Sequence, residues 1–166
     1  MKVVIGDITK AKDEYVLQQC NCISTTGRGL YKTLSDKFPY ADPYRTRGWN
    51  RADPGTFEIC EPPEGDIYGG PKIVCLYGQF CYGKPNHYET EIQRVGWFSQ
   101  ALDAFGQHLQ RGVREGKVKN KATIAIPHNI GCGLAGGNWA IYTQILTLFS
   151  QNHTNVVDVT VYKLHS

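Results

Sequence analysis

A glycine-rich segment late in the chain has the composition of a phosphate-binding loop. Residues 131–137 hold four glycines, between an apolar stretch that ends at Pro127 and an amphipathic stretch that begins at Trp139. Glycine lets backbone N–H groups approach a phosphate closely, and a helix after such a loop aims its positive end at the same place. The alternative is a flexible turn, but a turn needs only one or two glycines. We therefore predict a phosphate-binding loop.

The spacing Gly131-x-Gly133-x-x-Gly136 is that of a dinucleotide fingerprint, but its context differs from that of a Rossmann domain. Only one helix and one strand follow the loop, which leaves no room for the usual βαβ unit and its partner half. The sequence also lacks a Gly-x-x-x-x-Gly-Lys-Ser/Thr P-loop, a His-Glu-x-x-His pair and a Gly-x-Ser-x-Gly elbow. These absences count against a nucleoside triphosphatase, a zinc protease of that class and an α/β hydrolase.

A second polar loop follows an earlier strand and precedes a helix. Asn21 lies at the end of the apolar stretch 15–22, and Gly27, Arg28 and Gly29 come before helical spacing begins at Leu30. An asparagine side chain offers both a donor and an acceptor to a ligand hydroxyl. The alternative for Asn21 alone is a turn-forming role, but two such loops together favour a binding site.

Two histidines are candidates for a general base near neutral pH, since histidine titrates in that range. His128 directly follows a strand and precedes the second glycine loop, while His87 lies in the loop before the longest helix. A polar surface role or a capping role is the alternative for each.

Arginines and aromatic residues alternate in the irregular segment 39–54, which contains Arg45, Arg47, Arg51, Tyr44 and Trp49. Arginines interleaved with aromatic rings can hold single-stranded nucleic acid. The alternatives are a solvated loop or a wall beside the binding cleft.

Length and composition describe a folded chain of ordinary size. The 166 residues are 41% hydrophobic and 20% charged, and their net charge of +3 neither demands nor excludes a nucleic-acid partner. No apolar run reaches the length of a membrane span. Asp7 follows the first strand too soon for a signal peptide, so we expect a cytoplasmic protein, with the nucleus as the alternative. We expect the six cysteines to be reduced and zinc to be absent.

Hydrophobic periodicity predicts strands that alternate with helices through most of the chain. The spacing of Ile92, Val95, Phe98, Leu102, Phe105, Leu109 and Val113 predicts a long amphipathic helix. We predict strands over 2–5, 15–22, 56–60, 73–80, 123–127 and 156–164, and helices over 30–38, 92–115 and 139–149. This alternation predicts one α/β domain over residues 1–166, with a mainly parallel sheet between layers of helices.

Four segments in this order give the chain a resemblance to the macro domains, which bind ADP-ribose. They are the first strand with Gly6-Asp7-Ile8, Asn21 before Gly27-x-Gly29, the Ile130-Gly131-Cys132-Gly133-Leu134 loop before a tryptophan, and the closing strand Thr160–Leu164. The chain most resembles the single-domain branch with terminal ADP-ribose protein glycohydrolase and yeast-type ADP-ribose 1''-phosphate phosphatase. The resemblance implies a three-layer α/β/α fold with a mixed, mainly parallel sheet.

The resemblance also implies roles for individual residues. Asp7 and Ile8 would contact adenine, Tyr162 would stack near it, and Asn21 would lie beside the distal ribose. The remaining ligand-binding residues would form the two loops around the phosphates and the distal ribose: Gly27, Arg28, Gly29, Gly131, Cys132, Gly133 and Leu134.

Residues that branches of this family use in catalysis are missing here. Ala135 stands at the position of the glycohydrolase aspartate, the lysine position falls near Gln79, and the phosphatase histidine corresponds to Gln18. Lys84 would replace the lysine only if its loop were threaded differently. We therefore expect any catalysis to use Asn21 and His128, or a water held between a ligand phosphate and the loop backbone.

Three hypotheses follow from these patterns. The first is a hydrolase of an ADP-ribose derivative, by 1''-phosphate removal or by removal of an attached ADP-ribosyl group. The second is a non-catalytic module that binds ADP-ribose or a related nucleotide, and the third is a domain that binds RNA or poly(ADP-ribose). For all three we expect a monomer without metal, cofactor or membrane partner.

Overall fold

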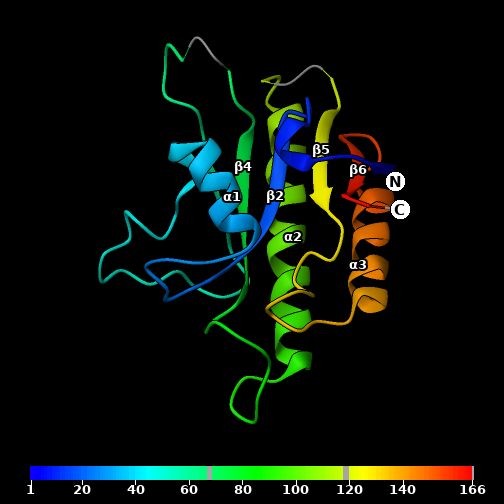
Figure 1. The fold of residues 1–166 in the computed structure, drawn as a ribbon. Helices are drawn as coiled ribbons and strands as arrows, with labels where there is room; N and C mark the ends of the chain where they lie inside the picture. Colours follow the sequence, from blue (N-terminus) through cyan, green and yellow to red (C-terminus); the bar gives the residue numbers. More distant parts are fainter. Residues whose placement is uncertain (67–68, 118–119, 166) are drawn as a thin grey trace.

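The computed structural model describes residues 1–66, 69–117 and 120–165, in which six strands form one sheet (Figure 1). The strands are β1 (Lys2–Ile5), β2 (Tyr15–Asn21), β3 (Phe57–Cys60), β4 (Lys72–Gln79), β5 (Ala122–Pro127) and β6 (Val157–Lys163). Their order across the sheet is β1-β6-β5-β2-β4-β3. Each neighbouring pair is parallel except the edge pair β3 and β4, which is antiparallel. The predicted mixed, mainly parallel sheet is therefore confirmed.

Helices cover both faces of this sheet. One face carries α1 (Leu30–Lys37) with the short 3-10 helices η1 (Ile8–Lys10) and η2 (Pro39–Ala41), while the other carries α2 (Glu91–Arg114) and α3 (Trp139–Asn152) (Figure 1). Two hydrophobic clusters fill the spaces between the layers. Phe98, Phe105 and Tyr142 anchor the cluster under α2 and α3, and Leu34 anchors the cluster under α1. The three predicted layers are present.

The central strands are apolar because both of their faces are covered. Along β4 the seven residues 73–79 are buried, and in β2 only Gln19 is less than fully buried. Strands covered on both faces are typically continuous apolar runs rather than alternating ones. Continuous burial is typical of interior strands of a sheet. Because β2 and β4 are parallel neighbours, their carboxyl ends lie side by side.

The predicted apolar stripe of the longest helix is wrong at both of its ends. Ile92 is 85% exposed and Val113 is 39% exposed, whereas Phe98, Leu102, Phe105 and Leu109 are buried as predicted. In the first turn of α2 the buried position is taken by Arg94, so Ile92 lies off the covered face of the helix. The two 3-10 helices were also missed, since three residues carry too little periodicity to be detected. Within the described part of the chain, no helix has both the length and the apolar character that a membrane crossing requires.

Two glycines in α2 provide a test of how closely the helical layer packs. A Cβ atom at Gly106 would collide with the ring of the buried His153, while a Cβ atom at Gly96 would meet nothing within 4 Å. We expect Gly106→Ala to lower the free energy of unfolding by about 1–3 kcal/mol through overpacking. The matched Gly96→Ala should raise it by about 0.5–1 kcal/mol, because alanine favours helix. Urea denaturation of both variants measures this, and equal shifts would contradict the described packing.

Candidate ligand-binding cleft

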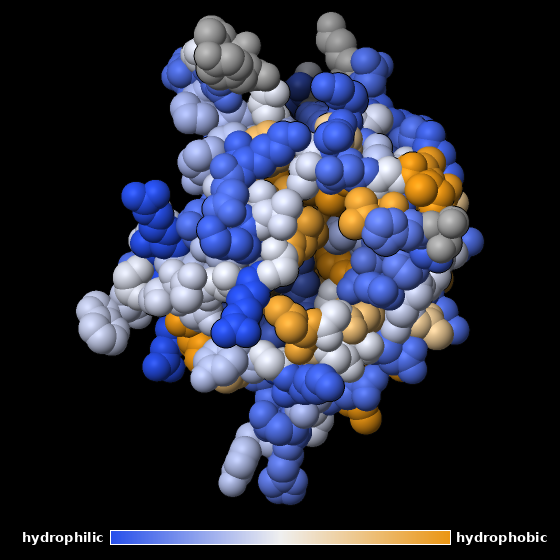
Figure 2. All heavy atoms as spheres, viewed as in Figure 1, coloured by the Kyte–Doolittle hydropathy of each residue, from blue (hydrophilic) through white to orange (hydrophobic). Residues whose placement is uncertain are grey.

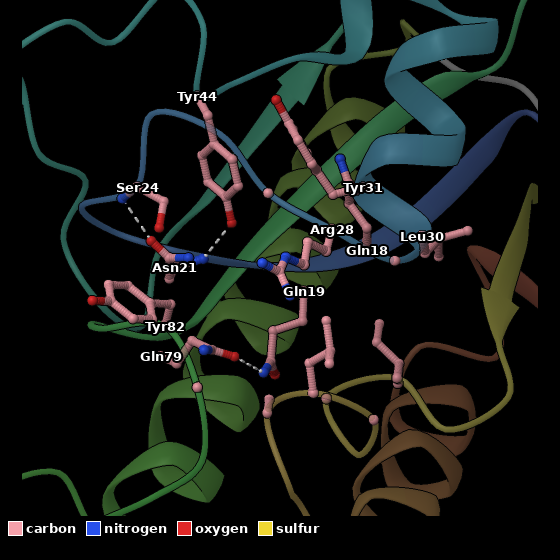
Figure 3. Close-up of a pocket in the computed structure, with 18 of the residues that line it drawn as sticks. Gln18, Gln19, Asn21, Ser24, Arg28, Leu30, Tyr31, Tyr44, Gln79 and Tyr82 are labelled. Atoms are coloured by element: carbon pink, nitrogen blue, oxygen red, sulfur yellow. Dashed lines mark hydrogen bonds between the residues drawn. The ribbon is translucent and has the colours of Figure 1, made fainter.

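A cavity of about 1030 Å³ opens at the carboxyl ends of β2, β4 and β5. Its walls come from the loop after β2 with the start of α1, from the end of β4 with Tyr82 and Gly83, and from the loop after β5. Figure 2 shows it as a hollow near the middle of this face. In Figure 3, Asn21, Ser24 and Tyr82 lie at one end and Leu30 lies toward the other. Both predicted loops therefore face one cavity.

A smaller cavity of about 560 Å³ adjoins the first one. Leu30, Pro127, His128 and Asn129 line both cavities, so the two adjoin along these residues, and we call them together the cleft. Gly6, Asp7, Ile8 and Tyr162 lie along the smaller cavity, as do residues 163–165 at the end of β6. The cleft therefore joins the predicted adenine-side residues to the two glycine loops.

Asn21 shapes its own loop and retains one free polar group. Its Oδ1 accepts hydrogen bonds from the backbone N–H groups of Ile23 (3.1 Å) and Ser24 (2.8 Å). Its backbone N–H donates to the Tyr44 hydroxyl at 2.8 Å. The side-chain amide nitrogen of Asn21 has no acceptor among the described residues, so it can donate to a ligand in the cavity that Asn21 lines.

Arg47 holds the Asn21 loop from behind. Its guanidinium donates to the carbonyl oxygens of Ser24 and Asn21, at 3.1 Å each, and lies 4.8 Å from the centre of the Tyr44 ring. Arg47 is only 8% exposed. The sequence-based grouping of Arg47 with Arg45 and Arg51 as contacts to nucleic acid is therefore wrong for Arg47, because its donors are used inside the protein. Tyr44 is also buried, so it cannot contact nucleic acid either.

The first glycine loop presents an uncapped helix start to the cleft. Gly29 is the N-cap of α1, with φ of +67° and no side-chain cap, and the first turn of α1 contains no acidic residue. Gly29, Leu30 and Tyr31 line the larger cavity together with the exposed Arg28. Gly27 packs so closely that a Cβ atom there would lie 2.7 Å from Tyr31. Free backbone N–H groups and the positive end of the α1 dipole favour an anion here.

The helix after the second glycine loop differs from the sequence expectation. The Asn138 side chain accepts a hydrogen bond from the Ala140 N–H, so α3 is capped by its own chain. The described lining of the larger cavity ends at Ala135 and includes no residue of α3. The helix dipole that points into the cleft is therefore that of α1. The sequence could not distinguish the two, because each helix follows a glycine loop.

The second loop is folded tightly at its base and open at its tip. Gly131 has φ of +71°, and a Cβ atom at Gly137 would lie 2.5 Å from the Gly131 carbonyl oxygen. A Cβ atom at Gly133 would meet nothing within 4 Å. Leu134, 65% exposed, stands at the mouth. This shape leaves space beside Gly133 for a ligand.

Cys132, Gly136 and Gly137 are the residues of the predicted 131–137 loop that line neither cavity. The Cys132 thiol donates to the Ile130 carbonyl oxygen at 3.3 Å, and burial raises its pKa to about 11. It is therefore a protonated thiol at neutral pH. All six cysteines are unpaired, and the described residues contain no cluster of three or more metal-ligating side chains.

The predicted adenine-side residues lie together at the other end of the cleft. Asp7 Oδ1 accepts hydrogen bonds from the Thr9 hydroxyl (2.8 Å) and the Thr9 N–H (2.9 Å), which lower the pKa of Asp7. Ile8 is buried beside it. The Tyr162 hydroxyl donates to Asp13 Oδ1 at 2.6 Å, which fixes the ring at the wall of the smaller cavity and raises its pKa to about 12.

Of the two histidines predicted as candidate bases, His128 is the one that the structure brings to the cleft. It lines both cavities, and its ring centre lies 4.8 Å from that of Trp139. Burial, and to a lesser extent Lys163, lower its pKa below 6.5. The imidazole is therefore neutral at pH 7 and able to accept a proton. His87 is exposed and lines neither cavity.

Three glutamines form the floor of the larger cavity, and sequence reasoning missed their importance. Gln19 Nε2 donates to Gln79 Oε1 at 2.6 Å (Figure 3), and Gln79 Nε2 donates to the Cys81 carbonyl oxygen at 2.9 Å. The buried Oε1 atoms of Gln18 and Gln19 have no partner among the described residues. No Asp or Glu occurs among the described residues that line this cavity. A glutamine within a strand carries no local signal of such a role, so only the tertiary contacts reveal it.

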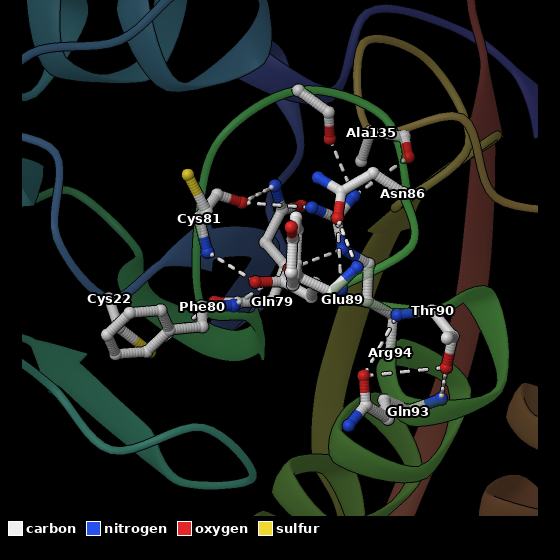
Figure 4. A network of polar contacts seen from close by, with 12 residues as sticks. Cys22, Gln79, Phe80, Cys81, Asn86, Glu89, Thr90, Gln93, Arg94 and Ala135 are labelled. Atoms are coloured by element: carbon white, nitrogen blue, oxygen red, sulfur yellow. Dashed lines mark hydrogen bonds and ion pairs between the residues drawn. The ribbon is translucent and has the colours of Figure 1, made fainter.

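A buried ion pair joins the loop after β4 to the second glycine loop (Figure 4). Arg94 Nε donates to Glu89 Oε2 at 2.6 Å, and both residues are buried. The other Arg94 nitrogens donate to the carbonyl oxygens of Gly83, Cys81 and Ala135. Glu89 also accepts hydrogen bonds from two backbone N–H groups, those of residues 80 and 81. The pair therefore holds one wall of the cleft to the other.

Removing the cation from this pair should destabilise the protein strongly. We expect Arg94→Met to lower the free energy of unfolding by about 3–5 kcal/mol, because it leaves a buried carboxylate without its partner. Combining it with Glu89→Gln should cost less than the sum of the two single changes. Urea denaturation measures each value. Arg111→Met, at an exposed site of the same helix, is the control and should change stability by less than about 0.5 kcal/mol.

Comparison with known proteins finds one sequence relative and several solved structures. No protein-family model matches the chain. The chain is 28% identical over 157 residues to the uncharacterized 17.5 kDa protein of the tk-vs intergenic region of Enterobacteria phage T4, an alignment that covers 90% of each protein.

Three solved structures share its architecture. The macrodomain of Mycobacterium tuberculosis DarG gives a TM-score of 0.70 at 21% identity, over 97% of this chain and 95% of that one. A point mutant of the Oceanobacillus iheyensis macrodomain with ADPR gives 0.64 at 18%, over 99% and 84%. Thermosipho africanus DarTG in complex with ADP-ribose gives 0.65 at 17%, over 97% of this chain and 40% of that one. The predicted fold class is confirmed.

Proposed function

We propose that this chain, whose fold is that of the macrodomains, binds ADP-ribose or a derivative of it in the cleft. The observation that carries the proposal is that the two cavities adjoin. Their linings place a tyrosine and a hydrogen-bonded carboxylate at one end of the cleft and two glycine loops at the other. An elongated dinucleotide-like ligand has the matching order of groups: a flat base, a central diphosphate and a second sugar.

Each part of the ligand has a chemically suited place in the cleft. Adenine would lie in the smaller cavity, where the Tyr162 ring offers stacking and Asp7 is an anionic acceptor. The diphosphate would lie between the start of α1 and the Gly131–Leu134 loop, where backbone N–H groups favour negative charge. The distal ribose would reach Asn21, whose amide nitrogen is free to donate to a hydroxyl. Two of the structures of similar fold contain ADP-ribose, which supports this assignment.

A negative charge at the tip of the second loop should abolish ligand binding. Gly133→Glu places a carboxylate where the diphosphate is proposed to lie, and the open space around Gly133 lets the variant fold. We expect its affinity for ADP-ribose to fall by at least about 100-fold, or about 2.7 kcal/mol. Titration calorimetry measures the loss. Gly96→Glu, an equally unobstructed site on α2, is the control and should bind normally. Normal binding by Gly133→Glu would place the phosphates elsewhere.

Hydrolysis of an ADP-ribose derivative is a second candidate function, and one observation favours it. His128 is a neutral imidazole at pH 7 beside the proposed diphosphate site, so it can accept a proton from an attacking water. The new P–O or C–O bond would form to that water oxygen as the bond to the leaving group breaks. Since the described lining of the larger cavity holds no carboxylate, His128 would act without an acidic partner there. A purely binding role is the alternative.

The pH dependence of turnover separates these two functions. With ADP-ribose 1''-phosphate or a mono-ADP-ribosylated protein as substrate, we expect the rate to rise as the pH increases through the His128 pKa, below 6.5, and then to level off. The sign follows because the base must be unprotonated. His128→Gln should lower the rate by about 100-fold or more while ADP-ribose affinity changes little. Tight ADP-ribose binding without turnover of either substrate would leave the binding function alone.

The cellular compartment that we propose for the protein follows from its cysteines. Six unpaired thiols suit a reducing compartment, so we propose that the protein acts in the cytoplasm. We propose that it acts as a monomer on ADP-ribose or on an ADP-ribosylated substrate.

A further inference from the structure

The protein surface beyond the Asn21 end of the cleft is built from three loops that the structure holds side by side. Arg47 binds the carbonyl oxygens of Asn21 and Ser24, and the Ala52 N–H donates to the Cys22 carbonyl oxygen at 3.1 Å. The Cys22 N–H in turn donates to the Phe80 carbonyl oxygen at 2.9 Å. Segments 23–29, 43–51 and 80–88 are therefore joined to one another at this end of the cleft, and we call them together the rim.

The exposed charges of the rim are all positive. Arg28, Arg45, Arg51 and Lys84 are exposed, and the three segments of the rim contain no aspartate or glutamate. Asp53, just after the second segment, is an exposed acid that lies close by in sequence. The three segments of the rim thus carry four exposed cations and no acidic residue, in a chain whose net charge is only +3. Such a set of charges favours a partner with repeated negative charge.

Exposed aromatic rings accompany these cations. The Trp49 side chain is fully exposed and Tyr82 is 69% exposed, although both are large rings that proteins usually cover. The Arg51 guanidinium lies 6.0 Å from the centre of the Phe80 ring, which holds it beside the end of β4. Tyr82 and Arg28 also line the larger cavity, so the rim and the cleft share residues.

We propose that the rim binds single-stranded nucleic acid. Phosphates would contact Arg45, Arg51 and Lys84, and bases would stack on Trp49 and Tyr82, the combination that characterises sequence-tolerant strand binding. An acidic peptide would use the cations but would leave the flat, fully exposed Trp49 ring without a partner. Duplex DNA would keep its bases stacked internally and away from both rings. Unpaired bases therefore fit the rings and cations together.

Arg28 and Tyr82 belong to both the rim and the cleft, so ligand binding at one site should affect ligand binding at the other. This coupling rests on the proposed function. A strand that contacts Arg28 and Tyr82 brings phosphates to the mouth of the cavity in which the diphosphate of ADP-ribose is proposed to lie. Two anions near one guanidinium repel each other and compete for its donors. We therefore expect each ligand to weaken the binding of the other, and by the same factor, since coupling between two sites is reciprocal.

Fluorescence anisotropy with a labelled single-stranded oligonucleotide of mixed sequence tests strand binding by the full chain. We expect Trp49→Ala to weaken binding by about 10-fold and Trp49→Phe to preserve it within about 3-fold, because phenylalanine retains a stacking face. Arg51→Ala should weaken binding and reduce the salt dependence by about one unit of slope. Arg114→Ala, at an exposed site near the end of α2, is the control and should bind normally.

Two comparisons make the result decisive. Equal displacement of the oligonucleotide by poly-glutamate and by unlabelled strand, or equal binding by wild type and Trp49→Ala, would overturn the proposal. ADP-ribose affinity, measured by calorimetry on the same variants without the strand, should remain unchanged because neither Trp49 nor Arg51 lines a cavity. ADP-ribose binding without strand binding would refute the rim alone, and strand binding without ADP-ribose binding would refute only the proposed function and the coupling between the sites.

Discussion

Glu89 and Arg94 form an ion pair that water barely reaches, and the walls of the cleft depend on it. Arg94 uses its remaining donors on carbonyl oxygens of residues 81, 83 and 135, so one guanidinium joins the loop after β4 to the second glycine loop. Glu89 accepts two backbone N–H groups at the end of β4. Buried charges are tolerated only when they are paired and hydrogen-bonded in this way. The cleft therefore has a fixed width on this side.

The opposite wall is held by a different device. Arg47 secures the Asn21 loop through carbonyl oxygens and the Tyr44 ring, without a carboxylate partner among the described residues. The Asn21 side chain accepts two hydrogen bonds within that loop, and the Tyr44 hydroxyl accepts a hydrogen bond from the Asn21 N–H. Two arginines far apart in sequence thus perform the same task on the two sides of the cleft. In contrast, Arg28, which lines the larger cavity, is exposed, as are Arg45, Arg51 and Lys84.

The cleft combines well-prepared binding groups with few reactive ones. The start of α1 and the Gly133 side of the second loop offer backbone donors without side chains in the way. In contrast, the floor is made of glutamine amides, which neither donate nor accept a proton in the neutral range, and His128 is the titratable group that lines both cavities. This distribution favours the proposed binding of ADP-ribose over its hydrolysis.

The sequence by itself determined where strands and helices follow one another along the chain, that helices form layers on the sheet, and where the two glycine loops lie. Periodicity and glycine spacing are local properties, so they can be read from the sequence. It also placed Asn21, His128 and Tyr162 on the cleft, partly through a family resemblance. Only the tertiary structure decided which helix start faces the ligand, since Asn138 caps α3 while no side chain caps α1. It also separated the buried Arg47 from the exposed Arg45 and Arg51, and it revealed the Gln19–Gln79 floor. These features depend on contacts between residues distant in the chain, and such contacts leave no periodic signal in the sequence.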